Sequence, residues 1–304
     1  MKNEEMKSTQ AAAAAGSTGA KALKRGAKAK TVAAKVAEVV TPTHERRQRV
    51  QAAETCLAVL KALATLGGRA SLTAIGAAVD ESPAKVHRYL ASLMAEGLVE
   101  QDRGGTQYAL GSEAIRVGLA AMRQSDPIRV AEPALLQLRE TLQVTSFVAV
   151  MGNLGPTIVR FEEPSLPVTV NVRVGSVMSM LWSATGRAFF AFMDDRVQVD
   201  SLVAQELAQA PADKRATLNA QDPLGVLRSE IRAQGCAAIR DINLPGISAV
   251  AAPLYDYTGH VVGVLCALGA TGGFDPDPQG RIARAICAEA ARVSASLGFV
   301  AVPA

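Results

Sequence analysis

The stretch that decides the fold is SPAKVHRYLASLMAEGLVEQDRGGTQYALG, residues 82–111. Ser82 is a common N-cap residue, and Pro83 suits the first helical position because its missing N–H costs nothing there. Gly97 then supplies a helix stop. Beyond it, two short strands flank the Arg-Gly-Gly of residues 103–105. The stretch therefore predicts a helix followed directly by a β-hairpin.

This helix has one apolar face, which can pack, and one polar face. The apolar face carries residues at three- and four-residue spacing, namely Val86, Leu90, Leu93 and Met94. The opposite face carries Ala84, Lys85, Arg88 and Ser92, and Arg103 stands at the tip of the hairpin. His87 falls between the two faces and is interpreted as partly packed.

Two further helices are predicted upstream. The first begins near Val50 and closes at Gly67-Gly68, with a stripe of Val50, Ala53, Leu57, Leu60 and Ala64 that Leu63 and Leu66 widen. Ser71 can cap the second, in which Leu72, Ile75 and Val79 share a face. Three helices and a hairpin within residues 50–111 are typical of a winged helix-turn-helix.

In such a domain the third helix enters the major groove of duplex DNA and the hairpin tip reaches the adjacent backbone. The candidate DNA-binding residues are Ser82, Ala84, Lys85, Arg88, Ser92 and Arg103. Any single exposed cation among them is more simply a solvated residue. Their arrangement on one helix and one hairpin favours DNA contact.

Residues 1–49 form a basic tail. They hold eleven Lys and Arg against four Asp and Glu, a local net charge of +7 that leaves −3 for the rest of the chain. The tail is rich in Ala, Lys, Gly and Thr and cannot build a core, so we expect it to be disordered. It is either a solubilising extension or an arm that neutralises DNA phosphates.

Composition limits the remaining classes of protein. The 304 residues are 49% apolar, enough for a core in each of two domains, and no apolar run is long enough to cross a membrane. We therefore expect a cytoplasmic protein without a membrane partner. The cysteines are expected to sit singly in the core, reduced, and no metal or other cofactor is predicted. They are Cys56, Cys236, Cys266 and Cys287.

Two helices are predicted to link the domains, within residues 112–143. The first places Ile115, Leu119 and Met122 on one face. Asp126 and Pro127 start the second, whose apolar stripe is Ile128, Ala131, Leu135, Leu138 and Leu142. Such an exposed stripe could pair two chains, as a DNA-binding protein with a palindromic site requires.

Residues 144–304 change to the period of β-strands. Strands are predicted at 145–151 and 156–162, at 247–257 and 260–270, and at 167–174, where Val168, Val170, Val172 and Val174 would point inward. Pro253 indicates an edge or a bulge. Helices are expected near 184–193, 197–208 and 224–234, and around Ile282, Ile286, Val293 and Leu297. Strands and helices interspersed in this way predict an α+β domain.

Three of these segments resemble the IclR family of bacterial transcriptional regulators: SPAKVHRYLASLMAEGLVEQ with YALG, LWSATGRAFFAF (181–192), and GISAVAAPLYDYTGHVVGVLCALG (246–269). The resemblance covers residues 50 to about 298. It places Arg88 on the family's recognition-helix arginine, Tyr108 on the tyrosine that closes the wing, and Gly186 and Ala188 at a small-residue helix start. It implies a GAF-like α/β effector-binding domain, a homodimer or homotetramer, and a palindromic operator.

A candidate effector site lies at the helix predicted to begin near Ser183. Free N–H groups and the positive end of the helix dipole suit a carboxylate there, and small Ala184 and Gly186 allow close approach. Thr185 adds a hydroxyl. Met178, Met180 and Trp182 either wall the pocket or simply fill the core.

The resemblance implies a far wall formed by Ile247, Ala249, Cys266 and Leu268. Several family members carry polar side chains at these positions, and Arg187 replaces the family's usual lysine. The pocket should therefore be more apolar, which favours an aromatic or branched organic acid as effector.

The sequence thus predicts a DNA-binding transcriptional regulator, repressor or activator, whose operator affinity is set by a small organic acid. An architectural DNA-binding protein without an effector is the alternative. An enzyme is less favoured because no histidine stands beside a nucleophile and no phosphate-binding glycine loop occurs.

Overall fold

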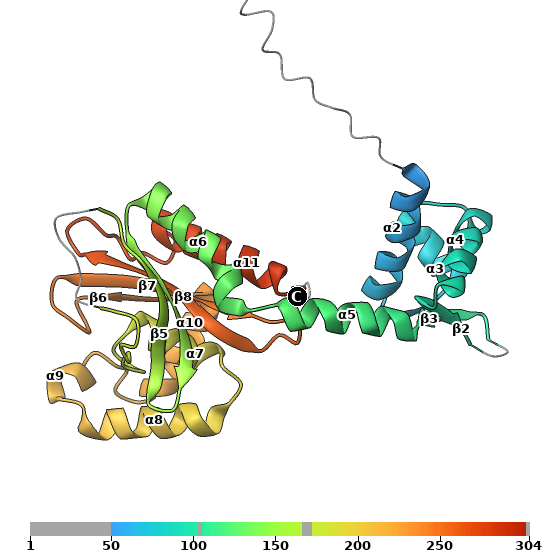
Figure 1. Ribbon diagram of the computed structural model, residues 1–304. Coiled ribbons are helices and arrows are strands. Elements are labelled where there is room, and N and C mark those ends of the chain that lie inside the picture. The colour runs from blue at the N-terminus through green and yellow to red at the C-terminus, as the bar shows by residue number, and fades with distance from the viewer. Residues whose placement is uncertain (1–49, 103–104, 166–171, 302–304) are drawn as a thin grey trace, which may run out of the picture. The chain divides into compact units, whose positions relative to one another are not determined.

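The computed structural model describes residues 50–102, 105–165 and 172–301. The chain forms two compact units that divide at Ile115 and Arg116. Figure 1 shows an N-terminal group of short helices and a C-terminal unit built on a β-sheet, as predicted. No helix in the described ranges combines the length and apolar character needed to span a membrane.

Three helices and a small sheet make up the first unit. The elements are α2 (Gln51–Thr65), β1 (Arg69–Ser71), α3 (Leu72–Val79), α4 (Pro83–Ala95), β2 (Val99–Gln101) and β3 (Gln107–Leu110). The antiparallel sheet has the order β1-β3-β2, so β1, which was not predicted, adds a third strand to the hairpin. Val86, Leu90 and Leu93 of α4 are buried with Ile75 of α3, as the spacing predicted.

The predicted apolar stripe of α2 is wrong in most of its residues, although Leu63 is buried and Leu60 packs partly buried against the core. Its buried residues are Val59 and Leu63, while Val50, Ala53, Leu57 and Ala64 are exposed. This helix is rich in alanine and has apolar side chains on most of its sides, so helical periodicity does not select a face. The packing of α2 against α3 and α4 selects it instead.

Two serines precede helices in this unit, but only one caps its helix with a side-chain bond. The Ser71 hydroxyl accepts a hydrogen bond from the Ala74 amide at 3.2 Å. Ser82 occupies the N-cap position of α4 without such a bond, and Pro83 follows it at the first helical position. Sequence alone assigned the same role to both.

Ser71→Ala should therefore destabilise α3 by about 1 kcal/mol, because one amide at the helix start loses its partner. Ser82→Ala is the matched control and should change the stability of α4 much less. Hydrogen–deuterium exchange of the amides in α3 and α4, followed by mass spectrometry, measures both. If Ser71→Ala reduced the exchange protection of α3 no more than Ser82→Ala reduces that of α4, the assignment of Ser71 as the cap would be contradicted.

Two helices follow the hairpin and differ in packing. α5 (Ser112–Gln124) has no buried residue, and Ile115 is 61% exposed. α6 (Pro127–Leu142) begins at Asp126, whose carboxylate accepts from the Ile128 amide at 2.9 Å. It buries Ala131, Ala134, Leu135 and Leu138 against the sheet of the second unit. Of the segment predicted as a linker, only α5 thus lacks a packed face.

The second unit contains a five-stranded antiparallel sheet with the order β5-β4-β8-β7-β6. Its strands are β4 (Thr145–Gly152), β5 (Gly155–Glu162), β6 (Ala237–Arg240), β7 (Ile247–Tyr255) and β8 (Val261–Ala270). Its later helices are α7 (Ala184–Phe192), α8 (Arg196–Gln209), α9 (Ala212–Arg215), α10 (Pro223–Gln234) and α11 (Arg281–Ser296). β6 and α9 were not predicted.

Helices cover both faces of this sheet, and each face has its own core. α6 and α11 pack on one side, with Leu135 and Ile286 among the buried residues. α7 packs on the other side against β7 and β8, backed by α8 and α10 (Figure 1). α7 is buried along nearly its whole length, which holds its first turn rigidly above the sheet.

Two predictions about strands have different outcomes. The segment 167–174 was predicted as a strand, and its described part is not one: Val172 is buried but Val174 is 61% exposed. Val168 and Val170 lie outside the described residues. Pro253 was predicted at an edge or bulge, and β6 pairs only with Ser248–Ala251, so Pro253 has a neighbouring strand on one side alone.

The four cysteines are free thiols, but they do not all sit singly. A hydrogen bond between the thiols of Cys236 and Cys287, together with burial, raises the pKa of Cys236. The same bond lowers the pKa of Cys287. Residues 236 and 287 are far apart in sequence, and only the packing of α11 on the sheet brings them together.

Candidate DNA-binding and effector-binding sites

The outer face of α4 is a surface suited to DNA. Ser82, Ala84, Arg88 and Ser92 are all exposed on it. Arg88 makes no ion pair with any described residue, so its guanidinium is available to a guanine edge or a phosphate. The Ser92 hydroxyl donates to the Arg88 carbonyl oxygen at 3.3 Å and stays within the helix.

Lys85 differs from Arg88, although sequence placed both on the exposed face. Its ammonium lies 2.5 Å from the Glu81 carboxylate, and the residue is half-buried. The hydrogen bond to Glu81 raises the pKa of Lys85. To contact DNA, Lys85 must first leave this partner. His87 was interpreted as partly packed, and this is wrong, because the residue is exposed.

The wing is anchored by contacts that sequence did not reveal. Arg103, the predicted cation of the wing tip, lies outside the described residues. Arg69 of β1 forms an ion pair with Asp102 at the base of the tip. Tyr108 is buried between β1 and β2, opposite Ala70 and Gln101. These contacts fix the base of the hairpin to the helical core.

A second candidate site is a small cavity between the start of α7 and the sheet. The space is about 20 Å³, which is room for one water molecule. Its lining includes eight residues that sequence proposed for the effector: Met178, Ser183, Ala184, Thr185, Ile247, Ala249, Cys266 and Leu268. The other three do not line it. Met180 and Trp182 are buried in the core, and Gly186 packs against the backbone of residues 179–180.

Five lining residues were missed: Phe147, Val172, Ile239, Asn243 and Leu244. Pairing of the strands explains two of them. Phe147 lies opposite Cys266 in the β4–β8 pair, and Ile239 lies opposite Ala249 in the β6–β7 pair. Recognising β6 from the sequence would have placed Ile239 here.

The first turn of α7 offers hydrogen-bond donors to this cavity. The Ser183 hydroxyl accepts from the Gly186 amide at 2.9 Å and donates to the Ser179 carbonyl oxygen at 2.6 Å. The amides of Ala184 and Thr185 donate to no described residue. Two free N–H groups at the positive end of a buried helix form a ready site for an anion.

Thr185 adds an unsatisfied polar atom. It is 1% exposed, and its hydroxyl oxygen has no hydrogen-bond partner of good geometry. Its neighbour is the Cys266 thiol, a weak partner. Burial raises the pKa of Cys266 to about 12, and the nearby Thr185 hydroxyl opposes this rise. Cys266 is therefore a neutral wall, and Thr185 retains a hydroxyl that a ligand can satisfy.

Neither site is built for a metal: the described residues contain no group of three or more His, Cys, Asp or Glu side chains that could hold one.

Comparison with known proteins gives matches for both units. Residues 52–103 match the model of the IclR helix-turn-helix domain, and residues 119–295 match that of the bacterial transcriptional regulator IclR C-terminal domain.

Individual proteins agree with these matches. The crystal structure of Pseudomonas aeruginosa HmgR is 38% identical, with a TM-score of 0.74, covering 82% of this chain and 99% of that one. The HTH-type transcriptional regulator BhcR of Paracoccus denitrificans is 25% identical over 73% of this chain and 78% of its own. The HTH-type transcriptional repressor AllR of Klebsiella pneumoniae is 26% identical over 82% and 90%. The chain belongs to the IclR family of bacterial transcriptional regulators.

Proposed function

We propose that this regulator binds an operator through α4 and the wing, and that a small organic acid held at the start of α7 sets its affinity for that operator. The observation that carries the proposal is the enclosed cavity, where the free amides of Ala184 and Thr185 and the unsatisfied Thr185 hydroxyl meet apolar walls. The regulator would act on DNA in the cytoplasm.

The two sides of the cavity favour an acid with an apolar body. Donors at the helix start stabilise a carboxylate. In addition, no described carboxylate side chain lines the cavity to repel it. Phe147, Ile247 and Leu268 form walls without hydrogen-bonding groups. Aromatic and branched acids fit this combination better than small, highly polar ones.

Two copies of α4 would read a palindromic operator. Ile115, Leu119 and Met122 give α5 an apolar face that is exposed in the single chain, which supports pairing of two copies in a homodimer or homotetramer. An effector that favours one spacing of the two α4 helices then changes operator affinity. A coupling free energy of about 1–3 kcal/mol gives a 5- to 150-fold change.

The test combines footprinting with thermal unfolding. DNA upstream of the protein's own gene is footprinted with and without aromatic and branched carboxylic acids, each compared with its neutral amide. An acid at 100 times its Kd should raise the free energy of unfolding by about 2.7 kcal/mol, and its amide should not. Thr185→Val, which keeps the shape but removes the hydroxyl, should weaken the response. No response to any acid, with a footprint present, would overturn the proposed effector.

The charge of residues 1–49 supports a second candidate function, an architectural protein that binds DNA mainly through this tail. In a plot of the logarithm of the DNA-binding constant against the logarithm of the salt concentration, deleting the tail should then make the slope less negative. The expected change is about 0.9 for each phosphate that the tail neutralises. Electrophoretic mobility shifts from 50 to 200 mM salt measure the slope. An unchanged slope in the deleted protein would exclude a role of the tail in binding.

A further inference from the structure

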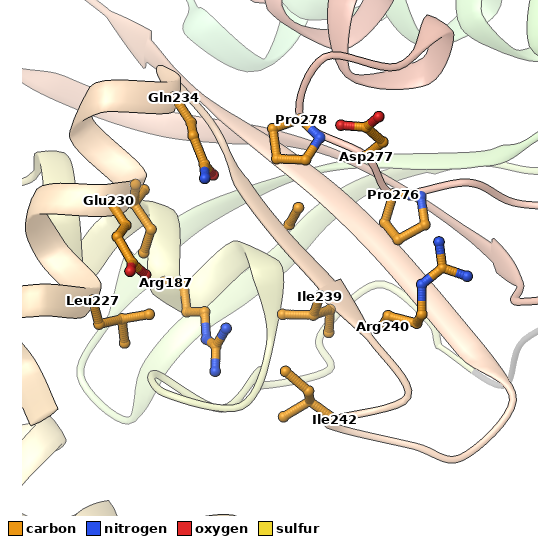
Figure 2. A pocket seen from close by; sticks show the side chains of 12 residues that line it. Arg187, Leu227, Glu230, Gln234, Ile239, Arg240, Ile242, Pro276, Asp277 and Pro278 are labelled. Carbon is orange, nitrogen blue, oxygen red and sulfur yellow. The ribbon is translucent and has the colours of Figure 1, made fainter. Parts of the chain in front are cut away.

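A larger cavity lies beside the proposed effector cavity, at the edge of the sheet. Its volume is about 380 Å³, it is open to solvent, and it is bordered by α10, β6 and the loop 276–278. Figure 2 shows Arg187 of α7 reaching into it from below Glu230, among Leu227, Ile239 and Ile242. Nothing in the proposed regulation by effector uses this cavity.

Arg187 is a buried charge with unused donors. The residue is 7% exposed, and its Nε donates to the Leu181 carbonyl oxygen at 2.7 Å. Its two terminal nitrogens make no hydrogen bond or ion pair with any described residue. Burial lowers the pKa of Arg187 to about 10, partly offset by Glu230, so the side chain remains cationic at neutral pH.

The two terminal nitrogens are not among the buried side-chain atoms that lack a partner, so they reach the open side of the cavity, where water or a bound anion has to complete their hydrogen bonds. The side chains around it are not suited to that role. Glu230 is exposed and acts only at a distance, and Arg240, the other cation of the lining, is paired with Asp275 at 2.9 Å. Two terminal nitrogens in one plane match the two oxygens of a carboxylate.

The rest of the lining sets the class of ligand. Leu227, Ile239 and Ile242 offer apolar contact next to the guanidinium. Glu230 and Asp277 are also part of the lining and would repel a second negative charge. We infer that this cavity is a second ligand site, which binds a small monocarboxylate with an apolar body, anchored by Arg187.

The site is placed to communicate with the proposed effector cavity. Ile239 lines both cavities, and it is 5% exposed between them. Arg187 follows Ser183, Ala184 and Thr185 on the same first turns of α7. A carboxylate on Arg187 would therefore act on the helix that carries the effector donors.

The test uses methyl NMR of the full-length protein with labelled isoleucine δ1 methyls. Of these two cavities, Ile242 lines the Arg187 cavity alone and Ile247 lines the proposed effector cavity alone, so the two methyls report the two sites separately. The probe is sodium benzoate, and benzamide is its neutral control. We expect benzoate to shift the Ile242 methyl saturably and benzamide to leave it unchanged.

Two variants complete the test. Arg187→Gln should weaken the benzoate affinity measured at Ile242 at least about tenfold, while any shift of Ile247 remains. Glu230→Gln, an exposed change that leaves Arg187 in place, should strengthen it about two- to fivefold. Glu230→Gln also keeps the test informative if Arg187→Gln does not fold. A shift confined to Ile247, an equal response to benzamide, or no effect of either variant would overturn the inference without touching the effector proposal.

Discussion

Arg88→Ala is expected to weaken operator binding by about 1–3 kcal/mol, a 5- to 150-fold rise in Kd. Arg88 is exposed on α4 and makes no ion pair with a described residue, so its removal costs the protein little stability and costs the complex a charge-assisted contact. If the guanidinium reads guanine, binding to operators mutated at that base should fall less than binding to the native one. Fluorescence anisotropy with both operators measures the difference.

Three controls define what the loss means. Arg88→Lys keeps the charge but not the two-pronged donor, so it should recover phosphate contact and not base discrimination. Lys61→Ala removes an exposed cation from α2 and should have little effect. Lys85→Ala should cost less than Arg88→Ala, because Lys85 first has to leave Glu81. An unchanged operator affinity of Arg88→Ala would show that α4 does not contact the operator.

Gly186→Ala should destabilise the second unit by about 3 kcal/mol, at the upper end of the cost of overpacking. A Cβ at this position would lie 2.0 Å from the Ser179 carbonyl oxygen and 2.4 Å from Met180 Cα, and both are backbone atoms that cannot turn aside. The start of α7 would have to move from residues 179–180, and the response to an effector should be lost with it. The expected fall in Tm is roughly 10 °C.

Unfolding of the second unit can be followed alone, because Trp182 is the chain's one tryptophan and is buried there. Gly118→Ala is the matched control. Gly118 lies in α5 with nothing within 4 Å of an added Cβ, so alanine should be neutral or favour the helix by up to about 1 kcal/mol. Equal melting temperatures for Gly186→Ala and the wild type would show that α7 is not tightly held at its start.

Sequence predicted the first unit where local signals were strong. Pro83 and Gly97 bound α4 within two residues, and the spacing of Val86, Leu90 and Leu93 identified its buried face. It failed for α2, where alanine and apolar residues surround the helix and tertiary packing decides. β1 is three residues long, too short for alternation to mark a strand.

In the second unit, sequence predicted the long paired strands and most of the helices, but less about what surrounds the site. Polar Arg173 between apolar Val172 and Val174 follows the alternation of a strand, yet Val174 is exposed. Alternation alone does not supply a neighbouring strand to pair with. Met180 and Trp182 stand beside the helix start in sequence, but their side chains are needed in the core. Ile239 was missed because β6 is only four residues long.

The size of the proposed effector cavity has a consequence for timing. A molecule with several heavy atoms cannot enter a space with room for one water unless Met178, Leu244 or their neighbours first swing aside. Capture of the proposed effector would then be limited by how often this wall opens rather than by diffusion, and the same wall would slow its release. Such a regulator would not respond to a brief rise in effector concentration. It would respond to a concentration that is sustained over many openings of the wall.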